Sequence, residues 1–270
     1  MSNSVLVFDS GSGGLTVAAE IRKKMPNVQL SYVSDGGFFP YGKKPHDLLK
    51  QRILNVVSAA SELTQPDIIV IACNTASTIA LDLLRAKLNV PIVGVVPAIK
   101  PAAALTKTGV VMVLGTHTTV NSAYVKQLIA DFATGCRVLI EDSEALVLAS
   151  EQKLISDPFD AQNVTQEMQR IFAQDAACET DVLVLACTHF PLLNDEIKHA
   201  IPSHVNVIDS GLAIANRVNT LLKMECKLDE KAKTREVTFY TTGELNSSEV
   251  KQRNIELLLD CSLTQRHLSI

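Results

Sequence analysis

Two cysteines stand at matching places in the sequence, each directly after a short apolar run. Cys73 follows DIIVIA (67–72), and Cys187 follows DVLVLA (181–186). The segments DIIVIACNTAS and DVLVLACTHFP align without a gap, because 187 − 73 and 181 − 67 both equal 114. A thiol can take or give a proton, so two thiols at equivalent positions could act on opposite faces of one carbon, one as base and one as acid. Such a pair would suit the inversion of a stereocentre by deprotonation.

Cysteine is also among the most buried residue types, so either cysteine taken alone would be assigned to packing. Their repetition favours chemistry, because small hydrogen-bonding residues follow each one: Asn74 and Thr75 in the first motif, Thr188 and His189 in the second. A cysteine at a helix N-terminus gains thiolate character from the backbone N–H groups and the macrodipole, so one thiol could be ionised while its twin keeps its proton. Asp9 and His189 are candidates for relaying or orienting those protons.

Other motifs leave alternatives open. DSGSGG (9–14) could hold a phosphate or a carboxylate at a helix N-terminus, although it is not GxGxxG and no GKS or GKT follows. Lys100 could suggest a Schiff base, but an isolated lysine after a strand is usually solvated. CTH (187–189) holds a thiol and an imidazole, yet no second Cys/His cluster completes a zinc set, and we expect no metal. The six cysteines show no CxxC spacing, and we expect free thiols.

Short Val/Ile/Leu runs alternate with helical patterns along the chain. Such runs suit parallel strands that are buried on both faces, with helices as crossovers, so we predict an α/β protein of doubly wound type. In open parallel sheets ligands bind beyond the carboxyl ends of the strands, where all the motifs above lie. The predicted strands are VLVF (5–8), LSYV (30–33), DIIVIA (67–72), PIVGVV (91–96), VVMVL (110–114), RVLI (137–140), DVLVLA (181–186) and VNVID (205–209).

The internal similarity indicates two α/β lobes. Beside the cysteine repeat, VLVFDSGSG (5–13) loosely matches VMVLGTHTT (111–119), again a strand that runs into small and hydroxyl residues. If the lobes face each other about a pseudo-twofold axis, Cys73 and Cys187 would meet in one cleft. We therefore expect mostly parallel sheets in two pseudo-symmetric lobes, with the active site between them.

Composition excludes several classes of function. The 270 residues are 47% hydrophobic and 20% charged, which is ordinary for a soluble chain. A net charge of −4 without a Lys/Arg cluster argues against nucleic-acid and membrane-surface partners and favours a small-molecule substrate. The N-terminus MSNSVLVFDSGSGG lacks the charged and apolar regions of a signal peptide, and no window holds the roughly 18 apolar residues of a membrane span. We expect a cytoplasmic protein.

At the level of motifs, the chain resembles the bacterial glutamate racemases of the cofactor-independent aspartate/glutamate racemase superfamily. The resemblance runs from about residue 5 to 243 and rests on FDSGSGGLTV, PYGKK, ACNTAS, GTHTTVNSAYV, LACTHFPLL, IDSG and FYTTGE, in this order and spacing. It implies an isomerase that needs no cofactor, interconverts L- and D-glutamate with two cysteines, and supplies D-glutamate for peptidoglycan. An aspartate racemase of the same superfamily and a Cys-His hydrolase or amidase are the alternatives.

The resemblance also assigns roles to residues. Cys73 would be the base that acts on D-glutamate and Cys187 the base that acts on L-glutamate, with Asp9 and His189 assisting. Glu151 stands where the family often has a glutamate near the cleft. The substrate-binding positions would be Asp9, Ser10, Tyr41, Gly42, Asn74, Thr75, Thr116, Thr119, Thr188 and His189.

The resemblance further implies a domain division and has local departures. One lobe would comprise residues 1–97 plus 208–270, completed by a strand at VTFYTT and a helix after SSEV, and the other residues 98–207. Gly115 and Thr118 stand where the family usually has Ala and Gly, and Pro45 where it has Ser or Thr. We expect glutamate as the small-molecule partner, leave a homodimer open, and expect no dependence on a cell-wall precursor activator, which some members bind through an N-terminal extension.

Overall fold

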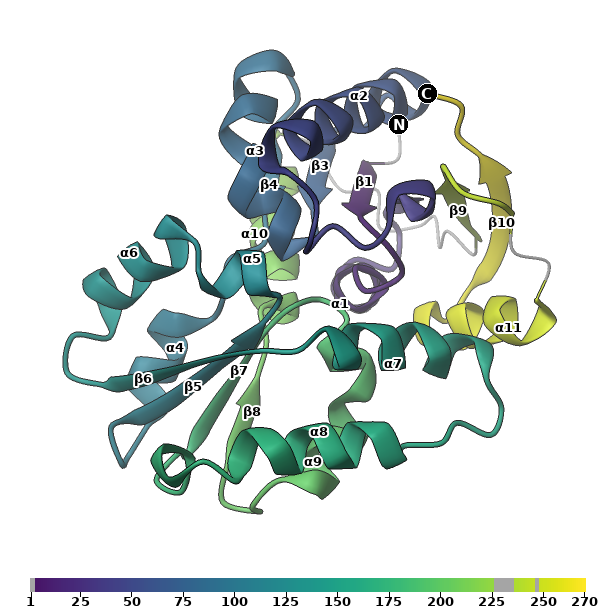
Figure 1. The fold of residues 1–270 in the computed structure, drawn as a ribbon. Coiled ribbons are helices and arrows are strands. Elements are labelled where there is room, and N and C mark those ends of the chain that lie inside the picture. Colours follow the sequence, from purple (N-terminus) through teal and green to yellow (C-terminus); the bar gives the residue numbers. More distant parts are fainter. Residues whose placement is uncertain (1–2, 226–235, 246–247) are drawn as a thin grey trace. The chain divides into compact units, whose positions relative to one another are not determined.

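The computed structural model describes residues 3–225, 236–245 and 248–270, which leaves Cys226 outside the described residues. The chain forms two compact units, with Met1–Val95 and Gly211–Ile270 in unit 1 and Val96–Ser210 in unit 2. Each unit is an α/β layer structure built on its own sheet (Figure 1). Every strand pair in both sheets is parallel, which confirms the predicted fold class.

Unit 1 contains a six-stranded sheet in the order β10-β9-β2-β1-β3-β4. The central strands β1 and β3 are apolar and buried on both faces, as crossover helices on both sides of a parallel sheet require. The strands are β1 (Ser4–Asp9), β2 (Gln29–Ser34), β3 (Ile68–Ile71), β4 (Ile92–Gly94), β9 (Glu236–Thr241) and β10 (Ser262–His267).

The helices of unit 1 form two groups. Helices α2 and α3 pack together and bury Leu49, Ile53 and Ala80 in one core cluster with Phe8 and Ile71 of the sheet. Helix α1 packs against α10 and α11 in the other group. The helices are α1 (Leu15–Lys24), α2 (His46–Thr64), α3 (Asn74–Lys87), α10 (Gly211–Glu225) and α11 (Glu249–Leu259), with a 3-10 turn η1 at Gly36–Phe38.

Unit 2 contains a four-stranded sheet in the order β6-β5-β7-β8. Helices α4 and α6 cover one face, where Ile99 and Val125 pack on Val113 and Val184, while α7, α8 and α9 pack together. Its elements are α4 (Ile99–Leu105), β5 (Val110–Gly115), α5 (His117–Val120), α6 (Ala123–Phe132), β6 (Arg137–Asp142), α7 (Glu144–Ile155), α8 (Gln162–Phe172), η2 (Asp175–Ala177), β7 (Val182–Ala186), η3 (Phe190–Leu193), α9 (Asn194–Ala200) and β8 (Asn206–Ile208).

The two sheets share one strand order over four strands. The order β2-β1-β3-β4 in unit 1 matches β6-β5-β7-β8 in unit 2, and β9 and β10 extend only the first. An aspartate just before the cysteine-bearing strand makes the same kind of contact in each unit. Asp67 accepts hydrogen bonds from the Ser4 backbone N–H at 2.7 Å and hydroxyl at 2.9 Å. Asp181 accepts from the Lys107 N–H at 2.6 Å and the Thr106 hydroxyl at 2.5 Å. Each carboxylate thereby ties its strand to the chain that enters the neighbouring one.

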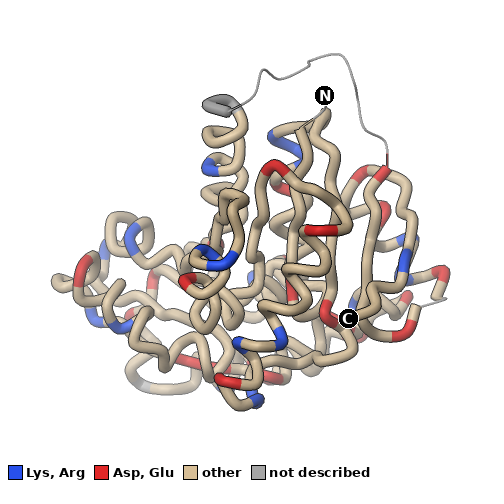
Figure 2. The backbone as a smooth tube through the Cα atoms, turned by 90° about the horizontal axis from the view of Figure 1, so that it is seen from above, with Lys and Arg blue, Asp and Glu red and all other residues tan. Residues whose placement is uncertain are grey.

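All eight strands predicted from the apolar runs are present, and β9 and α11 confirm the strand and helix expected near the C-terminus. Strand β10 was missed, because SLTQRH is mostly polar and lies at the sheet edge, where only Leu263 is buried. Basic and acidic residues are spread over the elements of both units (Figure 2). None of the described helices combines the length and apolar character that crossing a membrane requires.

Asp181 should make stability fall in acid. Burial raises the pKa of its carboxyl, but hydrogen bonds from Thr106, Lys107 and Thr108 outweigh it and lower that pKa overall. A carboxylate with a depressed folded pKa adds stability above its unfolded value of about 3.9, and this stability is lost as pH falls through the folded value. We expect Asp181→Asn to flatten the acid limb of unfolding free energy against pH, measured by urea titration. Asp131→Asn, at an exposed site, is the control, and identical acid limbs for Asp181→Asn and the wild type would contradict the assignment.

Candidate active site

The reactive residues of unit 1 lie where β1 and β3 end. These strands pair with Phe8 opposite Ile71, so Asp9 and Cys73 leave the sheet at the same edge. The loop after β1 folds tightly over this edge: Asp9 Oδ1 accepts the Gly11 N–H at 2.8 Å, and the Tyr32 hydroxyl donates to the Gly11 carbonyl at 2.9 Å. One N–H of the DSGSGG loop is therefore already held by a carboxylate of the chain itself.

Gly14 allows this close packing. A Cβ at Gly14 would lie 2.8 Å from the Cβ of Asp9 and 2.9 Å from that of Ala72, distances that real Cβ atoms do not reach. Glycine at this position therefore lets the loop approach the end of β3, directly before Cys73. Substitution by any other residue would push the loop away from the two strand ends.

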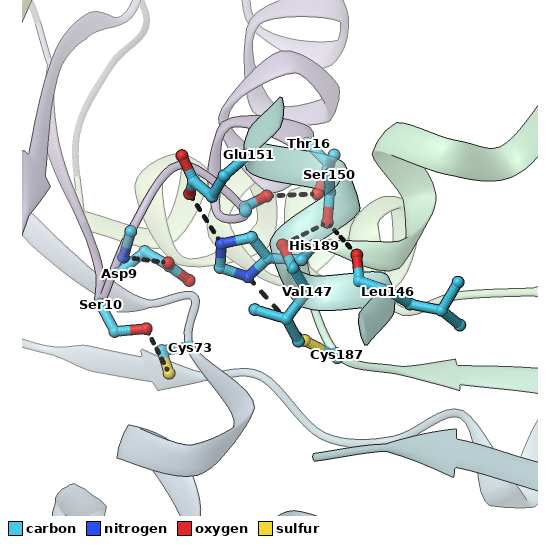
Figure 3. Close-up of polar contacts among 12 residues, drawn as sticks. Asp9, Ser10, Thr16, Cys73, Leu146, Val147, Ser150, Glu151, Cys187 and His189 are labelled. Carbon is cyan, nitrogen blue, oxygen red and sulfur yellow. Dashed lines mark hydrogen bonds and ion pairs between the residues drawn. The ribbon is translucent and has the colours of Figure 1, made fainter. Parts of the chain in front are cut away.

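Cys73 is the N-cap residue of α3. Its Sγ accepts the Ala76 backbone N–H at 3.4 Å. The same sulfur lies 3.5 Å from the Ser10 hydroxyl (Figure 3). The helix that follows has 14 residues, so its N-terminus places the positive end of a full macrodipole at the sulfur. Cys73 as a whole residue is 6% exposed. These surroundings favour negative charge on Sγ, as the sequence pattern predicted for a cysteine at a helix N-terminus.

The residue after Cys73 carries an unsatisfied polar atom. Among the described residues, two buried side-chain polar atoms have no hydrogen-bond partner, Asn74 Oδ1 and Thr180 Oγ1. Buried amide oxygens are nearly always bonded, so an orphan beside a candidate catalytic thiol points to a ligand that supplies the missing donor. Thr75, next along the helix, is also buried.

The hydroxyl of Tyr41 is engaged in a hydrogen bond within the chain. The side chain is buried, and the hydroxyl donates to Asp35 Oδ2 at 2.6 Å. Arg52 grips the same carboxylate with two nitrogens, at 2.6 Å to Oδ1 and 3.0 Å to Oδ2, and the Thr242 hydroxyl also donates to it. Burial, and then the charge of Asp35, raises the pKa of Tyr41 far above its usual value, so its hydroxyl stays protonated. Tyr41 acts here as part of a fixed network that holds the PYG loop.

In unit 2, Cys187 follows β7 and has different neighbours from Cys73. The helical segment that directly follows it is the 3-10 turn η3 of four residues, whereas the helix after Cys73 has 14 residues. Instead, His189 Nδ1 lies 3.9 Å from Cys187 Sγ, and His189 Nε2 lies 2.9 Å from Glu151 Oε1 on α7 (Figure 3). Because an ionised carboxylate only accepts, this contact assigns the ring proton to Nε2 and turns Nδ1 toward the thiol.

Thr116 and Thr119 lie at the start of the short helix α5 in unit 2. Thr116 caps α5, and its hydroxyl donates to the Thr119 hydroxyl at 3.0 Å. Gly115 precedes them, and a Cβ there would lie 2.7 Å from the Val120 side chain, so glycine keeps α5 close to the end of β5. Thr188 is buried between Cys187 and His189.

The site residues expected from sequence thus form two sets. Unit 1 contains Asp9, Ser10, Tyr41, Gly42, Cys73, Asn74 and Thr75, and unit 2 contains Thr116, Thr119, Cys187, Thr188 and His189 together with Glu151. Sequence reasoning missed Asp35 and Arg52. Asp35 could have been found, because it directly follows strand β2, just as Asp9 stands at the end of β1. Nothing in the sequence pattern of helix α2 distinguishes Arg52 from the other residues of that helix. Within the described residues, no cluster of three or more His, Cys, Asp or Glu side chains is arranged to hold a metal ion.

Several known proteins are similar to this chain in sequence and in architecture. Residues 16–218 match the Asp/Glu/Hydantoin racemase family model. A glutamate racemase from Shewanella sp. strain MR-4 is 42% identical over 269 residues, covering 98% of this chain and 96% of its own. The crystal structure of Escherichia coli glutamate racemase, in complex with L-glutamate and activator UDP-MurNAc-ala, has a TM-score of 0.89, 35% identity and full coverage of both chains. The Francisella tularensis enzyme with D-glutamate has a TM-score of 0.77 and 25% identity, covering 100% of this chain and 97% of its own.

Arg52 should be required for stability. Replacing it by Met leaves the fully buried Asp35 carboxylate without its cation, and breaking a buried pair typically costs about 3–5 kcal/mol. Arg52 is 26% exposed, so water can partly replace it, and we expect a loss of about 2 kcal/mol in urea unfolding. Arg52→Lys, which keeps the charge without the two-pronged contact, should lose less. If Arg52→Met were as stable as the wild type, Asp35 would not need the positive charge of Arg52, and the prediction would be wrong.

Proposed function

The chain belongs to the Asp/Glu/hydantoin racemase family, and we propose that it interconverts L- and D-glutamate by proton transfer at the α-carbon. The observation that carries the proposal is the pair of thiols at equivalent strand ends, each with its own means of handling a proton. Cys73 has the N-terminus of α3, and Cys187 has His189 backed by Glu151.

In the proposed mechanism each thiol acts on one face of the substrate's α-carbon. For D-glutamate, the Cys73 thiolate removes the α-proton and the Cys187 thiol delivers a proton to the other face. The roles reverse for L-glutamate. His189 Nδ1 can take the Cys187 proton and return it, while Glu151 stabilises the imidazolium that forms in between. Neither step requires a group that the chain does not carry.

The polar groups around the thiols suit glutamate. The substrate brings two carboxylates and one ammonium, so its site needs donors for the first and acceptors for the second. The unsatisfied Asn74 amide is a polar group next to Cys73, and Asp9 adds a buried carboxylate at the same edge. Ser10, Thr75, Thr116, Thr119 and Thr188 supply hydroxyls, and Gly42 a backbone group beside the fixed Tyr41. We propose that these residues bind the substrate.

Similarity to the solved structures supports the choice of substrate. The E. coli relative was crystallised with L-glutamate and the F. tularensis relative with D-glutamate, so both enantiomers are bound within this group of proteins. Aspartate is one methylene shorter, and a pocket discriminates against a missing methylene by about tenfold to 200-fold. Glutamate is therefore the proposed substrate, with aspartate as the test of chain length.

One feature of unit 2 also fits a Cys-His hydrolase. The order Cys187, His189 and Glu151 reproduces the nucleophile, base and carboxylate of such an enzyme. That assignment leaves Cys73 without a role, although its sulfur is as buried as that of Cys187 and caps a long helix. The racemase uses both thiols. The absence or presence of glutamine hydrolysis separates the two proposals.

The wider role follows from the product. We propose that the enzyme supplies D-glutamate for peptidoglycan and works in the cytoplasm, where a reducing environment keeps both thiols free. UDP-MurNAc-ala is an activator in the E. coli complex, so the rate of this protein with and without that compound tests the expected independence.

Purified protein should racemise L-glutamate with no added cofactor. We expect circular dichroism of an L-glutamate solution to decay to zero, L-aspartate to react at least about tenfold more slowly, and glutamine to stay intact. EDTA and carbonyl reagents should leave the rate unchanged, while thiol alkylation abolishes it, because the reacting groups are thiols. Full inhibition by EDTA, or release of ammonia from glutamine, would count against the proposal.

Both cysteines should be essential, in different ways. Cys73→Ala and Cys187→Ala should each abolish racemisation, since a missing acid is as fatal as a missing base, and losing either typically costs about a hundredfold to ten-thousandfold. A single remaining base can still exchange the α-proton with solvent deuterium. We expect Cys73→Ala to exchange L-glutamate and Cys187→Ala to exchange D-glutamate, measured by proton NMR.

The matched control is Cys136→Ala, which removes a thiol from a partly buried position outside both motifs and should racemise normally. Cys→Ser at the two essential positions should lose nearly as much as Ala, because a hydroxyl is a far poorer proton donor and acceptor at neutral pH. Near wild-type racemisation by either essential Ala variant would disprove the two-thiol mechanism.

A further inference from the structure

We propose that Lys153 is a positioning residue for the proton relay at Cys187, because it fixes the part of α7 that carries Glu151. The inference rests on the proposed function and adds a residue that acts through Glu151 and His189 rather than on the substrate. Lys153 donates to the Leu192 backbone carbonyl at 2.9 Å and to Glu196 at 2.7 Å. Leu192 belongs to η3 and Glu196 to α9, so one ammonium joins α7 to both segments that follow His189.

Helix α7 is held at its two ends by different means. At the N-terminus, the Ser143 hydroxyl accepts the Leu146 N–H, and the Ser143 N–H donates to the Gly115 carbonyl at 3.2 Å, which ties the helix start to β5. Glu151 lies two turns further along α7, beside the buried residues Ser150 and Leu154. Lys153 supplies a polar anchor at that end.

Glu151 and Lys153 reach the same region from different sides of the helix. Residues two apart do not share a helix face, so these side chains straddle α7, one binding His189 and the other Leu192 and Glu196. A rotation or shift of α7 about its axis is therefore resisted on both sides. Removing the Lys153 ammonium would take away the polar contact on one side, so that this end of α7 would be held by the packing of Leu154 and by the Glu151 contact alone.

Position matters more at Cys187 than at Cys73. The thiol of Cys73 has a helix N-terminus built into its own backbone, whereas Cys187 depends on a side chain whose Nδ1 is 3.9 Å from the sulfur. Misplacing a reacting group by about 1 Å can cost about a hundredfold in rate. A movement of α7 by a fraction of that distance would disturb the 2.9 Å contact that orients His189.

A purely structural role for Lys153 predicts something else. Lys153 is 31% exposed and Glu196 17%, so the ion pair is partly solvated and should add little to stability. If stability were its only contribution, removing it would leave the orientation and proton of His189 unchanged. The decisive readout is therefore the state of the His189 ring, which can be observed without any substrate.

The test compares Lys153→Met with the wild type by nitrogen NMR of protein labelled with 15N-histidine. The His189 signals are assigned from their loss in His189→Gln. In the wild type we expect the pattern of one tautomer, with the proton on Nε2. In Lys153→Met the Nδ1 and Nε2 shifts should move toward each other as tautomers exchange, and kcat for glutamate should fall about fivefold to tenfold, with KM little changed.

Two further variants serve as controls. Lys153→Arg can still donate to both acceptors and should restore the single-tautomer pattern and most of kcat. Lys198→Met removes an exposed lysine from the same helix as Glu196 and should change neither reading. An unchanged His189 spectrum in Lys153→Met would overturn the inference, whether or not kcat falls. A shifted spectrum in an enzyme that does not racemise glutamate would uphold the positioning role and reject the proposed function.

Discussion

The site depends on parallel strand pairing, which sends the carboxyl ends of neighbouring strands to one edge of a sheet. In unit 1 this constraint brings Asp9 and Cys73 out side by side, because β1 and β3 pair with Phe8 opposite Ile71. In unit 2 it places the end of β5 beside the end of β7, where Gly115 pairs with Ala186, directly before Cys187. Within each unit, the backbone hydrogen bonds of the paired strands therefore bring together strand ends that are far apart in sequence.

The same wiring supports two different thiol environments. Both units keep the strand order and the aspartate that ties the cysteine-bearing strand to its neighbour. After the cysteine they diverge: α3 runs for 14 residues from Cys73, while η3 after Cys187 has four. Because Cys187 is not the N-cap of a long helix, its thiolate needs another source of charge stabilisation, and the pair of His189 and Glu151 provides it. The two units thus share a strand order, while the elements and side chains around the two cysteines differ.

The features that could be predicted from the sequence are the buried strands and the repeated cysteine motifs. The strands could be found because buried parallel strands are continuous Val/Ile/Leu runs, and the two cysteine motifs because they align without a gap. Strand β10 was missed because an edge strand needs little apolar surface. Two ion pairs, Asp35–Arg52 and Lys153–Glu196, could not be predicted because each joins residues from separate elements. In the sequence alone, a single charged residue on a helix looks the same as a solvated surface residue. The substrate contacts of the individual site residues stay predictions.

The two environments must still serve one reaction in both directions. Enantiomers have equal free energies in water, so the equilibrium constant is one and kcat/KM must be the same for L- and D-glutamate, whatever the surroundings of the thiols. An environment that favours thiolate at Cys73 raises the fraction of this residue that is present as a base, but it makes that thiolate a weaker base and the thiol a stronger acid. The asymmetry between α3 at one thiol and His189 at the other therefore cannot favour one product. It can set which protonation form predominates in the free enzyme, and so how kcat and KM divide between the two directions while their ratio stays equal.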